Sequence, residues 1–370
     1  MSDRTNQFSR RTVLQGVSGG VATVGLAGIV SGDDRTTEIV TVKQGDEPVV
    51  VKKVSRTWWE HVETARAVRE RLQERLANDG DVESVALGLG SGTVGGRPER
   101  RVTVKVNDET ASPGLPDSID GVPVGIEEAR SINLHTGDYC DIEDEDPVPG
   151  GAALTHDSVG DDDPYFTATC PVMKGGFLHV LTTGHAFGSP TWCTTMSDVD
   201  VYQGESEEEI GELETVDIDA DYALIDHDSD LSLADEVKTS SSETVRISGH
   251  VTEDGMEYRK GDTIEKYGAK TCKTAGTLDE VDDGGHCSGD VDWVYVDDLT
   301  SEVGDSGSPY FDIWEDTEGC KWASIVAVHI GDVDDDTQDS IGCPAYEIVE
   351  REDEDIEFGY TFDSPCGPIQ

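Results

Sequence analysis

The chain has 370 residues, and its 79 acidic residues against 27 basic ones give a formal net charge of -52 at pH 7. This length exceeds that of one small domain and suggests two domains plus a leader. A surface of this charge repels phosphate backbones and anionic lipid headgroups, so we expect neither a nucleic acid nor a membrane as partner. Many carboxylates and only 6% aromatic residues are typical of surfaces adapted to molar salt, where the Debye length falls to about 3 Å.

The first residues of the chain carry an export motif. Ser9–Leu14, which includes two adjacent arginines, precedes a weakly apolar stretch of Gly, Ala and Val that runs to Val30. This arrangement resembles a twin-arginine signal, so residues 1–32 are expected to be a signal segment and the mature protein to be extracellular. The alternative is an arginine pair before a buried helix. The stretch is too short and glycine-rich for a membrane span, so no stable membrane insertion is expected after signal removal.

Residues 33–138 are predicted to form a small α/β domain. The segment Arg56–Asn78 has apolar residues at spacings of three and four, which predicts an amphipathic helix. Two strands are expected at Val82–Leu89 and Arg101–Val106, and Leu115–Val124 leads into a third. A helix packed on a small sheet follows from this order.

Residues 139–150 read as an acidic linker, and residues 151–370 as a mainly β domain. From residue 155 onward the pattern consists of short strands broken by Gly, Asp and Pro, without a long amphipathic helix. This is typical of antiparallel barrels, and we expect two barrels of the six-stranded type. Neither an EF-hand spacing nor a Cys-x-x-Cys pair occurs, so we expect no metal and no cofactor, with a calcium site in one of the acidic runs as the alternative.

The stretch Gly304–Pro309, with the sequence GDSGSP, provides the setting that a nucleophilic serine needs. Gly304 permits a tight turn, so the backbone amides of Gly304 and Ser306 can point at one carbonyl oxygen and form an oxyanion hole. Gly307 leaves room for an acyl group. A serine alone is a weak nucleophile, so a base and an orienting carboxylate must accompany it.

Both partners are found upstream of the serine. His185 follows the apolar run Phe177–Leu181 in the sequence LTTGHA, and Asp221 directly precedes the apolar segment Tyr222–Ile225. A strand that delivers the histidine and another that begins beside the aspartate bring the two side chains to one place. Other carboxylates lie close to Asp221 in the chain and are its rivals, namely Asp217, Asp219, Asp226 and Asp228.

The order His185, Asp221, Ser306 and the three local contexts resemble the chymotrypsin-like serine peptidases of the bacterial trypsin and streptogrisin type. The resemblance implies a secreted endopeptidase that cleaves proteins or peptides through an acyl-enzyme. His185 is then the base, Asp221 its orienting partner and Ser306 the nucleophile. The acidic composition resembles that of haloarchaeal proteins, and residues 33–138 resemble a small domain, either an accessory domain or a prodomain, that precedes the barrels in some relatives. The alternative function is a catalytically weak or inactive protein that acts as a peptide-binding or structural module.

All eight cysteines lie at or beyond Cys140, and an even number suits an exported protein. Eight cysteines allow 105 pairings, so their number alone does not choose among them. Cys272 and Cys287 resemble a hairpin bridge of the streptogrisin type. Cys170 and Cys193 bracket His185, and Cys320 and Cys343 flank the strand after the nucleophile. Cys140 and Cys366 remain. The expected disulfides are Cys170–Cys193, Cys272–Cys287, Cys320–Cys343 and Cys140–Cys366. Metal binding by Cys and His is the competing interpretation.

Three residues are candidates for the pocket that receives the substrate side chain. The segment around His329 resembles the G-x-H-x-G segment of glutamyl endopeptidases, which implies that His329 helps to bind an acidic side chain. Thr300 and Ser301 would form a polar, uncharged base and oppose a preference for Lys or Arg. His329 is alternatively a packing histidine of a strand, and Asp332 opposes an acidic substrate unless salt screens its charge.

Overall fold

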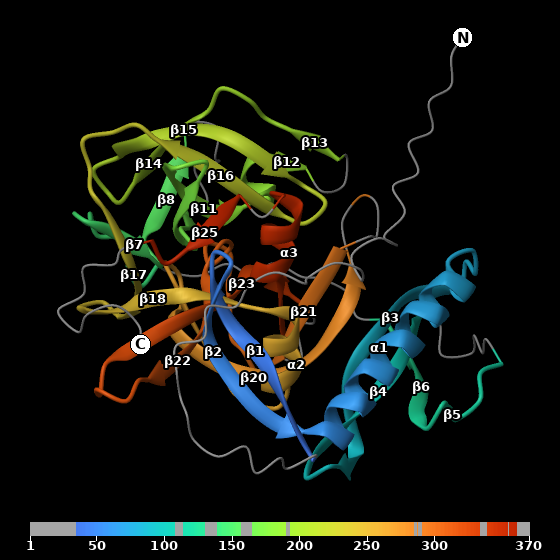
Figure 1. Ribbon diagram of the computed structural model, residues 1–370. Coiled ribbons are helices and arrows are strands. Elements are labelled where there is room, and N and C mark those ends of the chain that lie inside the picture. Colours follow the sequence, from blue (N-terminus) through green and yellow to red (C-terminus); the bar gives the residue numbers. More distant parts are fainter. Residues whose placement is uncertain are drawn as a thin grey trace. The chain divides into compact units, whose positions relative to one another are not determined.

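The computed structural model describes most of the chain from Arg35 onward, which belongs to one compact unit (Figure 1). The described residues are 35–107, 114–129, 139–156, 165–189, 193–284, 287, 291–333, 339–353 and 355–360. The expected signal segment, residues 1–32, lies outside them, as does Cys366. Within the described ranges, no helix is both long and apolar enough to cross a membrane.

The first part of the described chain places one long helix on a small sheet. Its elements are β1 (Thr36–Gln44), β2 (Glu47–Ser55), α1 (Arg56–Leu76), β3 (Val82–Val94), β4 (Arg97–Val106), β5 (Ser118–Ile119) and β6 (Val122–Glu128). The buried side chains of α1 recur every three or four residues from Trp58 to Leu76, and the C-terminal half of this face packs on valines of β3 and β4. The predicted helix is confirmed, and its apolar stripe is the reason for its position.

The hairpin β1–β2 was not expected from the sequence. It joins a later part of the chain, because β1 pairs with β18 (Glu243–Val251) at Val42↔Val251. Strand β3 also pairs with β20 (Cys272–Gly284), at Leu87↔Val281. Backbone pairing therefore connects residues 36–106 directly to the strands that follow residue 240.

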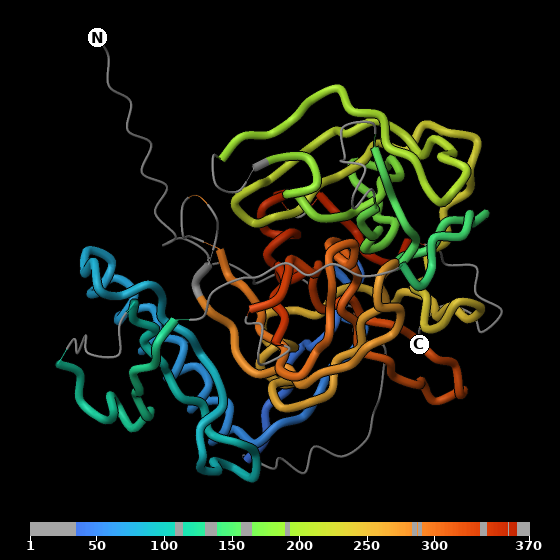
Figure 2. Tube along the Cα trace, turned by 180° about the vertical axis from the view of Figure 1, so that it is seen from behind, coloured from blue at the N-terminus to red at the C-terminus, as the bar shows by residue number. Residues whose placement is uncertain are grey.

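The first group of barrel strands follows residue 150 and appears green to yellow in Figures 1 and 2, apart from β25, which is red. Its sheet has the order β25-β10-β11-β16-β15-β14-β8-β9 and is antiparallel throughout. The strands are β8 (Ala153–His156), β9 (Phe166–Thr167), β10 (Cys170–Lys174), β11 (Phe177–Thr183), β14 (Asp200–Gln203), β15 (Glu208–Asp217), β16 (Tyr222–His227) and β25 (Ile356–Phe358). The short 3-10 helix η1 (His185–Phe187) and the small hairpin β12 (Gly188–Ser189) with β13 (Thr194–Thr195) follow β11.

The second group forms a closed ring of six antiparallel strands, β19-β20-β21-β24-β23-β22 and back to β19. The new strands of the ring are β19 (Thr263–Gly268), β21 (Val291–Asp297), β22 (Pro309–Glu315), β23 (Lys321–Asp332) and β24 (Ser340–Pro344). Outside it lie β7 (Val148–Gly150), β17 (Leu233–Ser240), α2 (Glu253–Arg259) and α3 (Ala345–Arg351). One closed six-stranded barrel and a second half-barrel confirm the predicted fold class, a mainly β double barrel preceded by a small α/β part.

All four expected disulfide pairings are wrong. Cys140 bonds with Cys272 and Cys193 with Cys287, across 132 and 94 residues of sequence. These two bonds exclude the pairs Cys170–Cys193, Cys272–Cys287 and Cys140–Cys366. Cys320–Cys343 is excluded because Cys343 is a free thiol, whereas Cys320 is itself disulfide-bonded. The physical reason is burial: Cys170 and Cys343 point into the apolar core between the barrels and act there as small hydrophobic side chains.

Basic side chains of the first part of the chain meet acidic side chains of α2 and of the barrel strands β20 and β21. Each nitrogen lies 2.6–2.8 Å from its carboxylate oxygen. The pairs are Arg66–Asp254, Arg69–Asp292, Arg100–Glu257 and Lys105–Glu280. Arg100 and Glu257 are both almost completely buried. Burial alone raises the pKa of Glu257, but Lys260, Arg100 and Arg66 outweigh it and lower that pKa to about 2.

We predict that Arg100→Met reduces the free energy of unfolding by about 3 kcal/mol, because the change leaves a buried carboxylate with one cation fewer. Lys260, 2.6 Å from Glu257, limits the loss. The matched control is Arg71→Met, which removes the exposed Arg71–Asp120 pair and should cost less than about 1 kcal/mol. Denaturant unfolding in molar salt measures both values. Equal losses in the two variants would contradict the structural role of the buried pair.

Candidate active site

The histidine and the aspartate of the predicted triad lie side by side at the ends of two paired strands. β11 and β16 pair at Thr183↔Tyr222, so Asp221 stands at the edge of β16 and His185 two residues beyond β11. The Nδ1 atom of His185 lies 2.8 Å from Oδ2 of Asp221. The other carboxylate oxygen accepts bonds from the backbone N–H of His185 at 2.7 Å and the hydroxyl of Thr183 at 2.9 Å.

The backbone is shaped for this pair at two positions. Asp221 has a φ of +59°, a left-handed conformation that a short polar residue tolerates. Gly184 runs so close to β16 that an added Cβ would lie 3.0 Å from the backbone of Tyr222. Two rival carboxylates are engaged elsewhere: Asp217 accepts a bond from Arg351 at 2.8 Å, and Asp219 accepts one from the backbone N–H of Cys287 at 2.8 Å. The geometry thus selects Asp221 among the aspartates of this segment.

Two opposing effects act on the imidazole of His185. Burial lowers its pKa, while the charge of Asp221 and the hydrogen bond to it raise the pKa. The net effect is a pKa above the ordinary value of 6.5. A charged imidazole is therefore stabilised by the buried carboxylate, as a histidine that accepts a proton during a reaction requires.

The loop with Ser306 connects two strands of the second barrel and contacts the first barrel. The backbone N–H of Thr167 donates to the carbonyl of Ser306 at 2.8 Å, and the hydroxyl of Thr169 donates to the carbonyl of Gly307 at 2.6 Å. Gly307 has a φ of +88°, and an added Cβ would lie 3.1 Å from the backbone nitrogen of Thr183. Ser306 is therefore fixed beside the end of β11, two residues before His185.

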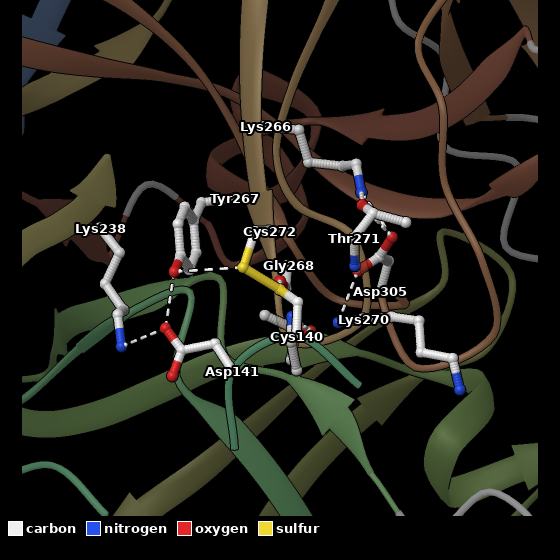
Figure 3. Close-up of a disulfide and its surroundings, with 12 residues drawn as sticks. Cys140, Asp141, Lys238, Lys266, Tyr267, Gly268, Lys270, Thr271, Cys272 and Asp305 are labelled. Atoms are coloured by element: carbon white, nitrogen blue, oxygen red, sulfur yellow. Dashed lines mark hydrogen bonds and ion pairs between the residues drawn. A yellow bond between two sulfur atoms is a disulfide. The ribbon is translucent and has the colours of Figure 1, made fainter. Parts of the chain in front are cut away.

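A buried ion pair holds the residue that precedes the serine. Lys266 of β19 and Asp305 are both fully buried, and Nζ lies 2.7 Å from Oδ2. Thr271 donates its hydroxyl to the same oxygen at 2.6 Å (Figure 3). Burial alone raises the pKa of Asp305, but Lys266 and Thr271 outweigh it and lower the pKa. Lys266 was not predicted from the sequence. The sequence feature that could have indicated it is a lysine inside a short strand, in a chain with few cations.

Two of the candidate pocket residues, Ser301 and His329, lie in one polar cluster with Asp332, Ser340 and Tyr310, which were not expected as binding residues. The hydroxyl of Ser301 donates to Oδ1 of Asp332, and Ser340 donates to the same atom at 2.9 Å. His329 is buried, and its Nδ1 lies 2.7 Å from the hydroxyl of Tyr310. Thr300 is half-buried in the loop between β21 and β22.

The imidazole of His329 is uncharged in this cluster, because burial, together with the charge of Lys266, lowers its pKa to about 3. The hydroxyl of Tyr310 lies 2.7 Å from Nδ1 of His329 and 3.1 Å from the carbonyl oxygen of Ile341, so it bridges the ring and the backbone.

No protein-family model matches the chain, and no curated protein does. Among solved structures, a glutamic acid-specific serine protease is 22% identical and aligns over 57% of this chain and 100% of its own, with a TM-score of 0.43. Protease A of Thermobifida fusca is 15% identical over 57% and 97%, with a TM-score of 0.42. A chymotrypsin of Cellulomonas bogoriensis is 18% identical over 58% and 99%, with a TM-score of 0.40. At this identity and TM-score, the matches show no activity for this chain. The strand pairings described above are those of a chymotrypsin-like double barrel.

We predict that Asp221→Asn lowers the pKa of His185, because it removes the charge that raises this pKa and leaves the opposing effect of burial. An NMR titration of the histidine rings measures the change. Asp226→Asn serves as the control, since this carboxylate lies on the same strand but is 58% exposed. The titration of His185 should be the same in the control as in the wild type. An unchanged midpoint in Asp221→Asn would refute the electrostatic coupling.

Proposed function

We propose that the protein is a secreted serine endopeptidase that cleaves peptide bonds through an acyl-enzyme. The observation that carries the proposal is the bonded pair of His185 and the buried Asp221, with the loop of Ser306 fixed against the strand that leads to this histidine. Protease-like architecture and this arrangement together favour nucleophilic catalysis over a purely structural role.

In the proposed reaction the same residues act first in acylation and then in deacylation. His185 takes the proton of the Ser306 hydroxyl while the oxygen attacks the scissile carbonyl, and the amides of Gly304 and Ser306 bind the oxyanion. Asp221 keeps the proton on Nδ1 and stabilises the charged ring. The imidazolium then protonates the leaving amine, and the C–N bond breaks. Water, activated by His185, attacks the acyl-enzyme and releases Ser306.

We also propose that the protein is exported by the twin-arginine route and works in molar salt. Arg10 and Arg11 support the route, and the charge of -52 supports the salt requirement. Disulfides persist in oxidising compartments, which agrees with an extracellular location. The paired basic residues between the first part of the chain and the second barrel support a permanent accessory role for residues 33–138 rather than release as a prodomain.

We expect Ser306→Ala to lower the turnover of casein in molar salt by several orders of magnitude, because it removes the nucleophile. A fluorophosphonate probe should label the wild type and not the variant. Ser197→Ala, which changes an exposed serine, is the control and should retain labelling and turnover. A wild-type protein that binds peptides but neither turns over nor reacts with the probe would favour the alternative function, an inactive peptide-binding module.

The preference for an acidic substrate side chain, expected from the segment of His329, is not what this polar cluster favours. Asp332 already takes the hydrogen bonds of Ser301 and Ser340. His329 is uncharged, so it supplies no positive charge to bind a carboxylate. We propose that the pocket prefers Lys or Arg, because both side chains carry donors only and neutralise Asp332.

Cleavage profiling with a peptide library in high salt tests this preference. The wild type should cut after Lys or Arg, and Asp332→Ser should lose at least about tenfold in kcat/KM for these residues, the equivalent of one charge-assisted hydrogen bond. Asp339→Ser is the control, because it changes another buried carboxylate beside β24. Predominant cutting after Glu by the wild type would restore the acidic pocket and overturn the role of Asp332.

A further inference from the structure

We propose that residues 139–141, the entry strap, position the oxyanion loop of the active site, with Tyr139 as the positioning residue and the Cys140–Cys272 disulfide as its anchor. The inference rests on the proposed function, because it assigns the amide of Gly304 to the oxyanion hole. The entry strap leads into the barrels, and a single turn of the second barrel connects it to the loop of Ser306.

The entry strap is bound tightly to the turn between β19 and β20. The backbone N–H groups of Cys140 and Asp141 both donate to the carbonyl of Ala269 at 3.0 Å. The disulfide from Cys140 reaches Cys272, at the start of β20, with a Cα–Cα distance of 5.8 Å (Figure 3). Two hydrogen bonds and one disulfide therefore join the strap to this turn and to the first residue of β20.

Asp141 fixes the other end of the strap. Its Oδ2 accepts a hydrogen bond from the hydroxyl of Tyr267 at 2.6 Å and lies 2.8 Å from the ammonium of Lys238. Figure 3 shows both partners converging on this carboxylate. Asp141 and Lys238 are almost completely buried, so the strap is held by interactions that salt screens little.

The same turn grips the residue before the nucleophile. The backbone N–H groups of Lys270 and Thr271 donate to Oδ1 of Asp305, each at 3.0 Å, and the hydroxyl of Thr271 donates to Oδ2. On the side of the first barrel, Thr167 accepts a bond from the N–H of Ala269 at 3.1 Å and donates to the carbonyl of Gly304 at 2.8 Å. The turn therefore transmits the position of the strap to the oxyanion loop.

Tyr139 contacts the oxyanion loop directly. Gly304 has a φ of +105°, and an added Cβ would lie 2.5 Å from Cε1 of Tyr139, so the ring lies directly against the glycine. The ammonium of Lys270 lies 3.8 Å from the centre of the ring, and Tyr165 packs edge to face with it at 5.1 Å. A glycine peptide rotates easily when nothing restrains it. The held ring disfavours rotation and keeps the Gly304 amide in one orientation.

Steady-state kinetics of two substitutions tests the role of the ring. Tyr139→Ala should lower kcat at least about tenfold with KM nearly unchanged, because a misplaced oxyanion donor weakens binding of the transition state more than of the ground state; complete loss of one donor costs 10²–10³. Tyr139→Phe keeps the ring and should stay within about twofold of the wild type. Phe177→Ala, which removes a 71% exposed aromatic ring elsewhere, is the control. Retained kcat in Tyr139→Ala, in an active wild-type background, overturns the inference.

A second measurement does not require turnover. Hydrogen exchange of the segment 302–308, followed by mass spectrometry, should accelerate in Tyr139→Ala and not in Tyr139→Phe. The double variant Cys140→Ala/Cys272→Ala should show the same acceleration, whereas Cys193→Ala/Cys287→Ala removes the other disulfide and should not. Unchanged exchange in both Tyr139→Ala and Cys140→Ala/Cys272→Ala rejects the strap, even if the wild type is inactive. Inactivity with the expected exchange pattern instead counts against the proposed function alone.

Discussion

The fully buried pair of Lys266 and Asp305 is the interaction on which the candidate active site depends. It joins the first strand of the closed barrel to the residue before Ser306. Replacing such a pair with apolar residues can be neutral, but removing one partner leaves an uncompensated buried charge and costs about 3–5 kcal/mol. Backbone amides and a hydroxyl complete the shell of the carboxylate. The nucleophile loop is thus held by the buried ion pair on the side of the second barrel and by hydrogen bonds with threonines on the side of the first barrel.

The local sequence patterns predicted the features that depend on neighbouring residues alone, namely strand ends, burial and turn geometry. The apolar run before His185, the aspartate at the start of a strand and the glycines around Ser306 reveal burial and turn geometry, and the structure brings these segments together. The pairing of Cys140 with Cys272, the docking of β1 on β18 and the contact of Lys266 with Asp305 were not predictable in this way. A side-chain period shows that a residue is buried, but it does not name the partner from a distant segment. The contact of Ser301 with Asp332, on which the proposed substrate preference rests, belongs to the same class.

The distribution of charge gives the molecule two electrostatic regimes. Carboxylates dominate the composition, whereas several of the few cations are used inside, where Lys105, Lys238, Lys260 and Lys266 are all buried. Exposed like charges repel each other less as salt shortens the Debye length, while buried pairs are screened far less. Molar salt can therefore relieve repulsion at the surface without weakening the pairs that hold the first part of the chain, the entry strap and the nucleophile loop.

Strand β25 determines when the sheet of the first barrel can be completed during synthesis. Residues 356–358 return from the second barrel and pair with β10 of the first, so the edge of the first barrel stays open until the strands of the closed ring and β25 after them have been synthesised. An incomplete chain on the ribosome that lacks β25 also lacks this edge. The proposed active site would then assemble only after the strands of both barrels have been made. A route that exports folded proteins would receive the molecule only after this closing strand is in place.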